Sequence, residues 1–264
     1  MRNTFWTLSA TLLLVGSVAR ADGNPRDDKQ VSRPRFDAAA SGEQGLLLSS
    51  LVAPGSANAS PVVATTWAGY DSGPGSPVVR SFVDATVYGP LALRAGISYV
   101  PESSVRSIQP HVGARVTLLE QSKHGFDLGV GLFYRMERFT QEEGLAQALL
   151  SAAVHFGRTG LFANVAYGQD LEGDDMEGEG ALALLHRISR GFQLGVESHA
   201  RFKLGSSDEK RRDQPVQTFD AFFAPTASYA LGPVAVFAEV GPSLYRLHGM
   251  HAGVLALAGV GGAL

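Results

Sequence analysis

A run of alternating residues from Phe192 to Leu204 constrains the fold of this chain more than any other feature. Every second residue of the run is apolar or small, and the positions between them include Gln193, Glu197 and Arg201. Successive side chains of a β-strand point to opposite faces, so the run predicts a strand with one apolar and one charged face. Ordinary strands have about five or six residues, whereas a tilted strand that crosses a membrane needs about 9–11. The run therefore predicts a membrane-spanning strand.

About twelve runs of this kind follow one another between about Pro61 and Leu264. They are joined alternately by short turns, such as Gly89-Pro90 and Arg190-Gly191, and by longer polar connections such as GSSDEKRRDQPV. Short turns at one end and longer loops at the other are typical of outer-membrane barrels. An even number of strands also leaves both ends of the ladder on the short-turn, periplasmic side.

Two architectures are compatible with one apolar and one polar face per strand. In a soluble sandwich or a lipocalin-like barrel the apolar residues point inward, whereas in a membrane barrel they face lipid. Strand length, loop asymmetry and glycines on the polar faces favour the membrane barrel, and so do aromatic residues near the ends of the runs, as an interfacial girdle requires. The sequence predicts an all-β fold, a transmembrane antiparallel up-and-down β-barrel of about 12 strands, with 10–12 plausible.

This assignment of faces makes specific substitutions informative. Arginine in place of Val196 or Leu128 is expected to block folding, because both side chains would face lipid. Glycine on the polar face is interpreted as making room in a narrow lumen, so Gly195→Ser is expected to be tolerated. The runs GALALLHRIS and AGVLALAGV alternate poorly.

The N-terminal region differs from the ladder. Residues 1–21 have a basic start, an apolar stretch and the small-x-small site Ala19-Arg20-Ala21, which predicts a cleaved signal peptide. Residues 22–60 are predicted to be a disordered or periplasmic segment, in which Gly45–Ala53 could form a short helix, an extra strand or a plug. The barrel is assigned to residues 61–264. The chain has no cysteine, which excludes disulfides and lipoprotein lipidation, and its net charge of −3 gives no indication of a nucleic-acid partner.

The signal peptide and the strand ladder together resemble Gram-negative outer-membrane β-barrel proteins. The resemblance covers residues 1–21 and about 61–264, and it is one of architecture rather than of a specific motif. It implies location in the outer membrane, with outer-membrane lipids, lipopolysaccharide and the barrel-assembly machinery as partners. Proteins of this class often end in a strand with a terminal phenylalanine, whereas this chain ends in Leu264.

Some barrels of this class are lipid-modifying enzymes that use a serine activated by histidine. None of the seven histidines lies in a His-x-Ser element, and Ser198 and His199 are neighbours that point to opposite faces. The sequence thus predicts neither an enzyme nor a cofactor. No metal site is predicted, because His248 and His251 lack a third ligand beside them. The acidic segment 172–179 lacks calcium-loop spacing and is interpreted as a solvated loop tip.

The predicted lumen is the remaining candidate site. Its lining is expected to include Arg94, His111, Arg115, Asp127, Arg135, Glu137, Glu197, His199, Arg201 and Glu239, with Arg80, Asp84 and Asp220 also pointing inward. Charges in a narrow lumen must be paired or hydrated. The set is therefore either an ion-pair network that fills the barrel or the lining of a narrow pore for a small solute or ion. The leading prediction is a narrow pore or small-solute transporter, with a closed structural or partner-binding barrel and a lipid-modifying enzyme as alternatives.

Overall fold

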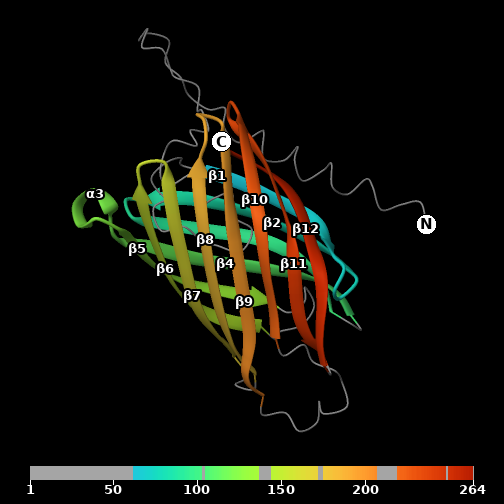
Figure 1. Ribbon diagram of the computed structural model, residues 1–264. Coiled ribbons are helices and arrows are strands. Elements are labelled where there is room, and N and C mark those ends of the chain that lie inside the picture. The colour runs from blue at the N-terminus through green and yellow to red at the C-terminus, as the bar shows by residue number, and fades with distance from the viewer. Residues whose placement is uncertain are drawn as a thin grey trace, which may run out of the picture.

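Twelve antiparallel strands form a closed barrel in the computed structural model (Figure 1). The structure describes residues 62–102, 105–136, 144–171, 175–206, 219–247 and 249–263. The strands are β1 (Val62–Asp71), β2 (Ser76–Tyr88), β3 (Leu91–Glu102), β4 (Val105–Leu119), β5 (Asp127–Met136), β6 (Gly144–Phe156), β7 (Thr159–Asp170), β8 (Asp175–Arg187), β9 (Phe192–Ser206), β10 (Phe219–Leu231), β11 (Val234–Leu247) and β12 (Gly249–Ala263). The predicted fold class and strand number are confirmed.

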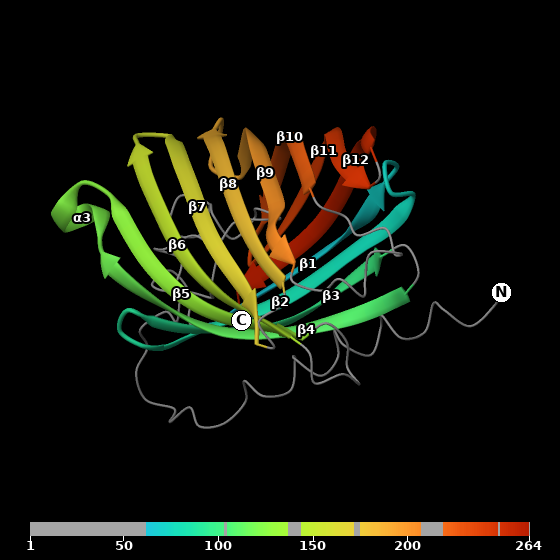
Figure 2. The same ribbon diagram turned by 90° about the horizontal axis from the view of Figure 1, so that it is seen from below.

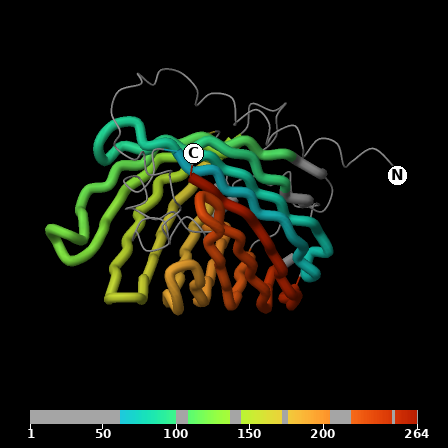
Figure 3. Tube along the Cα trace, turned by 90° about the horizontal axis from the view of Figure 1, so that it is seen from above, coloured from blue at the N-terminus to red at the C-terminus, as the bar shows by residue number. Residues whose placement is uncertain are grey.

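Each strand pairs with its neighbours in sequence, and β12 closes the barrel against β1. Figure 3 shows the red end of the chain lying beside the blue start of β1. In a ring of twelve, β3 lies opposite β9, and Figure 2 shows β2, β3 and β4 forming the wall across from β8, β9 and β10. This opposition of walls determines which side chains face one another across the lumen.

The short turns of the β2–β3, β6–β7, β8–β9 and β10–β11 connections lie at one end of the barrel. The predicted asymmetry of the loops holds only in part, because a single residue separates β11 from β12 at the other end. Gly89, Gly157 and Gly232 adopt the left-handed backbone conformation in three of these turns, with φ of 50°, 60° and 71°, which glycine does without steric penalty. The connection between β4 and β5 contains the helical turn α3 (Gln121–His124), which ends at Gly125 with a φ of 83°. No helix in the described ranges is long and apolar enough to cross a membrane.

The outer surface of the barrel is apolar, as the predicted assignment of faces requires. Strand β7 illustrates the alternation: Leu161 and Val165 are exposed, whereas Phe162 and Asn164 between them are buried. On β5, Leu132 is 72% exposed. A soluble barrel would place these side chains inside, so the exterior is that of a barrel surrounded by lipid.

Strands β8 and β12 alternate in burial even though their sequences hardly alternate in polarity. On β8, Ala183 and Leu185 are buried, whereas Leu182 and Leu184 are exposed. The inner face is apolar here because it packs in the lumen: Ala153, Phe162, Ala181, Ala183 and Leu185 form one buried cluster. A second cluster on β1, β11 and β12 comprises Val63, Trp67, Ala235, Phe237, Leu255, Leu257 and Ala263. Part of the lumen is therefore filled by apolar side chains.

The expectation that Gly195 tolerates serine was wrong. A Cβ atom at this position would meet the carbonyl oxygen of Leu184 and the side chain of Leu185 on the neighbouring strand. Glycine at 195 therefore permits close approach of β8 and β9, rather than making room in the lumen. The predictions for residues 1–21 and 22–60 fall outside the described residues.

Candidate functional site

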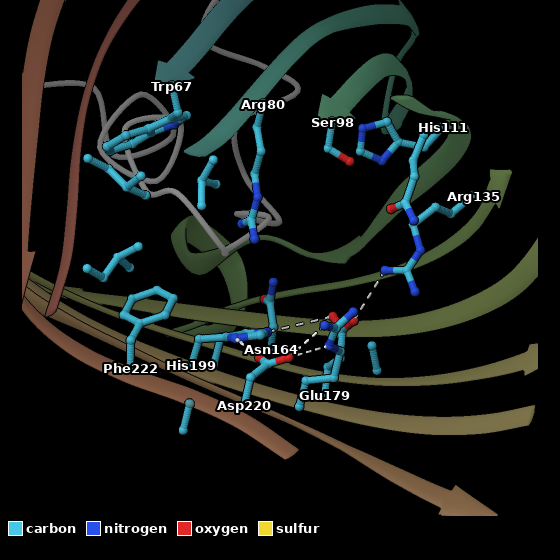
Figure 4. A pocket seen from close by; sticks show the side chains of 18 of the residues that line it. Trp67, Arg80, Ser98, His111, Arg135, Asn164, Glu179, His199, Asp220 and Phe222 are labelled. Carbon is cyan, nitrogen blue, oxygen red and sulfur yellow. Dashed lines mark hydrogen bonds and ion pairs between the residues drawn. The ribbon is translucent and has the colours of Figure 1, made fainter. Parts of the chain in front are cut away.

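A cavity of about 270 Å³ lies inside the barrel. It extends from Asp71, Pro74 and Tyr245, near the end opposite the short turns, to Asp84 and Ala181 in the middle of their strands. Figure 4 shows that side chains from walls on opposite sides converge on this space. Three kinds of lining meet there: a cationic group, an acidic group and an apolar group.

Asp84 is the centre of the cationic group. It lies directly opposite Arg94 across β2 and β3, and the guanidinium of Arg94 donates to it in bidentate fashion, through Nε at 3.0 Å and Nη2 at 2.9 Å. Arg115 on β4 makes a second ion pair with Asp84 at 3.3 Å. The side chains of Asp84 and Arg115 are only 7% and 5% exposed, so two arginines share one buried carboxylate.

Arg80 and His111 extend this group toward the cavity. Arg80 interacts electrostatically with Glu179 and Asp220 of the opposite wall and with Glu239 on β11, and Figure 4 shows its side chain reaching from β2 toward the opposite wall. The His111 ring lies 4.7 Å from the ring of Phe82, centroid to centroid. Its buried Nε2 has no hydrogen-bond partner within the part of the chain that the structure describes.

The acidic group lies on β8 and β10. Asp220 faces Arg201 directly across β9 and β10, and the Nη2 and Oδ2 atoms of the two side chains are 2.6 Å apart. The ring of His199 lies between two carboxylates, with Nδ1 3.8 Å from Asp220 and Nε2 3.9 Å from Glu179. Glu179, the ring of His199 and Asp220 thus form a row across β8, β9 and β10.

Arg135 links β5 to this row. Its Nη2 atom lies 2.6 Å from Glu177 and its Nη1 atom lies 3.8 Å from Glu179, so its side chain spans the inner faces of β6 and β7. The prediction that the acidic segment 172–179 is a solvated loop tip was wrong for these two residues. Strand β8 begins at Asp175, and Glu177 and Glu179 point into the lumen because they continue the alternation of Ala181 and Ala183.

The apolar group belongs to β1, β10 and β12. The Trp67 ring packs against Phe237 with centroids 3.9 Å apart, and Leu255 and Leu257 complete this side of the cavity. Phe222 packs against the same cluster, and its ring centroid lies 5.7 Å from that of His199. Figure 4 shows Trp67 and Phe222 together at one side of the cavity.

The formal charges lining the cavity balance. The lining contains four arginines, Arg80, Arg94, Arg135 and Arg201, and four carboxylates, Asp71, Asp84, Glu179 and Asp220. Each wall has an excess of one sign. The wall of β2, β3 and β4 carries Arg80, Arg94 and Arg115 against Asp84, and the wall of β8, β9 and β10 carries Glu177, Glu179 and Asp220 against Arg201. An electric field therefore crosses the cavity from the β2–β4 wall to the β8–β10 wall, although the formal charges of the lining sum to zero.

The structure divides the predicted lumen residues into two levels. Arg94, His111, Arg135, His199 and Arg201 line the cavity, and Arg115 is buried beside Asp84. Asp127, Glu197 and Glu239 are buried nearer the short turns and do not line it; Asp127 accepts a hydrogen bond from the Gln121 backbone N–H at 2.7 Å. Glu137 lies outside the described residues. Glu177 and Glu179 were missed, although the odd-numbered alternation of β8 could have revealed them.

Ser198 and His199 do not form a dyad in the structure. Ser198 donates to the carbonyl oxygen of Leu182, on the face opposite the lumen-facing His199. No group of three or more histidine, aspartate or glutamate side chains suited to a metal ion occurs among the described residues. His251 stacks on Tyr245, and its predicted companion His248 lies outside the described residues.

No protein-family model and no curated protein matches this chain. Among solved structures, it is similar to the NanC porin, with a TM-score of 0.53 and 13% identity over 76% of this chain and 100% of that chain. It is also similar to the KdgM porin in complex with disordered oligogalacturonate, with a TM-score of 0.51 and 11% identity over 76% of this chain and 99% of that chain. At such low identity the likeness shows the fold alone: the chain has the closed antiparallel β-barrel fold of these porins.

Proposed function

We propose that this protein forms a narrow pore in the outer membrane through which a small polar solute passes. The observation that carries the proposal is a charged cavity enclosed by a barrel whose exterior is apolar. Ion pairs that only fill a barrel leave no space for a ligand, whereas here they border a cavity. Its volume of about 270 Å³ is at the lower limit of typical ligand pockets, which favours a solute of a few non-hydrogen atoms.

Side chains pack the lumen between the cavity and the short turns. Phe162, Gln193 and Glu197 are fully buried and do not line the cavity, whereas Trp67, which is also fully buried, lines it. Solutes would pass this level one at a time, with side-chain movement. The same packing favours the main alternative, a closed barrel with a structural or partner-binding role.

Location and partners follow from the same proposal. The chain would be exported by a cleaved signal peptide over residues 1–21 and inserted by the barrel-assembly machinery, with outer-membrane lipids and lipopolysaccharide around its apolar exterior. It would act without a cofactor and without enzymatic activity. Resistance of the membrane-bound protein to carbonate extraction is the expected result, and recovery as a soluble periplasmic protein would contradict the proposal.

Single-channel recording in planar bilayers tests the pore. The refolded protein should give small, discrete conductance steps. A folded protein that gives no steps would reject the pore and leave the closed barrel. Release of fatty acids from phospholipid or lipopolysaccharide vesicles would instead favour a lipid-modifying enzyme.

A further inference from the structure

We infer that the lumen is specific for a small zwitterion with an apolar group, that is, a solute that carries a carboxylate, an ammonium and a short hydrocarbon side chain. This inference rests on the proposed function, because it names the class of solute that the pore would take. It follows from three properties of the cavity: its balanced charge, the opposition of its charged walls and its apolar side.

The balance of charge in the lining argues against a solute that carries charge of only one sign. Four arginines and four carboxylates line the cavity, so neither an anion nor a cation gains from the net field. An anionic sugar, such as the oligogalacturonate found with the KdgM porin, would meet the carboxylates of Glu179 and Asp220 without a compensating excess of arginine. A solute of zero net charge avoids this repulsion.

The opposition of the walls selects a zwitterion over an uncharged solute. A guanidinium has five N–H donors, and Asp84 uses those on Nε and Nη2 of Arg94. Arg94 therefore retains N–H donors for a second carboxylate, and Arg80 of the same wall also lines the cavity. A solute carboxylate would bind at this wall.

An ammonium would bind at the opposite wall. The ion pairs of Glu179 with Arg135 and His199 are long, at 3.8 and 3.9 Å, and its side chain is 23% exposed. A solute ammonium that comes within hydrogen-bonding distance of Glu179 would make a shorter, charge-assisted interaction than either. Asp220 lies next along the row and is bound by Arg201.

The apolar side of the cavity selects the third group of the solute, its hydrocarbon side chain. Trp67, Phe222, Leu255 and Leu257 line the cavity between the two charged walls, from β10 through β12 to β1. A hydrocarbon side chain on the solute would contact these residues and remove apolar surface from water. A zwitterion without such a side chain would leave this surface hydrated.

Tryptophan fluorescence can measure this specificity. Of the two tryptophans, Trp6 lies in the proposed signal peptide and Trp67 lines the cavity. The fluorescence of the mature protein, without residues 1–21, therefore reports on the cavity alone. Leucine is the probe. Leucinamide lacks the carboxylate, N-acetylleucine lacks the ammonium charge, glycine lacks the side chain, and galacturonate is an anionic sugar.

We expect leucine to bind about tenfold or more tightly than leucinamide or N-acetylleucine, because each analogue loses one charged hydrogen bond. Glycine should also bind more weakly. If N-acetylleucine or galacturonate binds as tightly as leucine, the lumen is an anion site and the inference is overturned, even when the protein conducts. Conversely, preference for leucine without any conductance would support the inferred solute class and refute the pore.

Two variants locate the contacts. Glu179→Gln should weaken leucine binding about tenfold and should strengthen N-acetylleucine binding, because a carboxylate that repels an anion is removed. Phe222→Ala should abolish the preference for leucine over glycine, whereas its neighbour Phe223→Ala, whose side chain is exposed on the outer face, should keep it. Unchanged preferences in both cavity variants would overturn the assignment, and the series of analogues on the parent chain tests it independently of any variant.

Discussion

Replacing Asp84 with asparagine removes a carboxylate that forms ion pairs with both Arg94 and Arg115. The three side chains are 7%, 15% and 5% exposed, and asparagine keeps the size of the side chain while removing its charge. Breaking a buried ion pair by removing one partner destabilises a protein by about 3–5 kcal/mol. Arg94 lines the cavity and is the most exposed of the three, so we expect a value near the lower limit, about 3 kcal/mol, for the loss in free energy of unfolding.

The matched control is Glu120→Gln. Glu120 and Lys123 form an ion pair of 3.0 Å, close to the 2.9 Å of the Asp84–Arg94 pair, but their side chains are 43% and 68% exposed. Exposed pairs contribute about 0.2–1 kcal/mol. The two distances are similar, so the comparison isolates the effect of burial in the lumen.

Urea unfolding of the refolded protein in detergent micelles measures both losses, with heat-dependent migration on gels as a check on folding. The reasoning requires Asp84→Asn to lower the free energy of unfolding by at least 2 kcal/mol more than Glu120→Gln, an estimate from the ranges above. Equal losses in the two variants would show that water in the lumen screens Asp84 as fully as it screens an exposed carboxylate.

Three further outcomes are expected. Leu132→Arg, on the lipid face, should lower the free energy of unfolding by about 2–4 kcal/mol, and a variant that folds as well as the parent in lipid vesicles would reject the assignment of faces. Gly195→Ala should be destabilising because its Cβ would meet Leu184, whereas Gly180→Ala, with no atom within 4 Å of its Cβ, should not be; urea midpoints compare the two. If the lumen conducts, Arg135→Gln should shift ion selectivity toward cations, and reversal potentials in a salt gradient would contradict this if they stayed unchanged.

The strand ladder was predictable because a lipid environment imposes period-two alternation on every strand. Val130 and Leu132 face outward and Gly129 and Gly131 face inward on β5, as the sequence indicated. Turn glycines such as Gly157 marked the short connections. These signals are local, so they can be read without knowing which strands are neighbours.

The apolar lining of the lumen was not predictable from the same rule. Trp67, Phe133 and Phe237 point inward, although an apolar residue in a membrane barrel is expected to face lipid. The polarity of a residue indicates its face only where the interior is hydrated. Where side chains pack together inside the barrel, both faces are apolar and the pattern of β8 and β12 becomes ambiguous.

The set of charged residues in the lumen was predictable from the sequence, but the partner of each residue was not. Asp84 and Arg94 lie opposite each other because of the register of β2 and β3, and Arg135 reaches Glu177 across two intervening strands. Register and shear decide such pairs, and neither is encoded in the alternation of a single strand. Of the carboxylates predicted to line the lumen, Asp127, Glu197 and Glu239 lie nearer the short turns than the arginines that line the cavity.

The pairing of β1 with β12 has a consequence for the order in which the barrel forms. Every other ladder joins strands that are consecutive in sequence, whereas Val63 pairs with Ala263. The hairpins can therefore assemble through local contacts, each with a small entropy of loop closure, but the seam joins residues 200 positions apart and requires nearly the whole chain. Until β12 arrives, the growing sheet has two open edges, at β1 and at its latest strand. Unpaired backbone groups are strongly unfavourable in lipid, so completion of the seam commits the chain to the membrane.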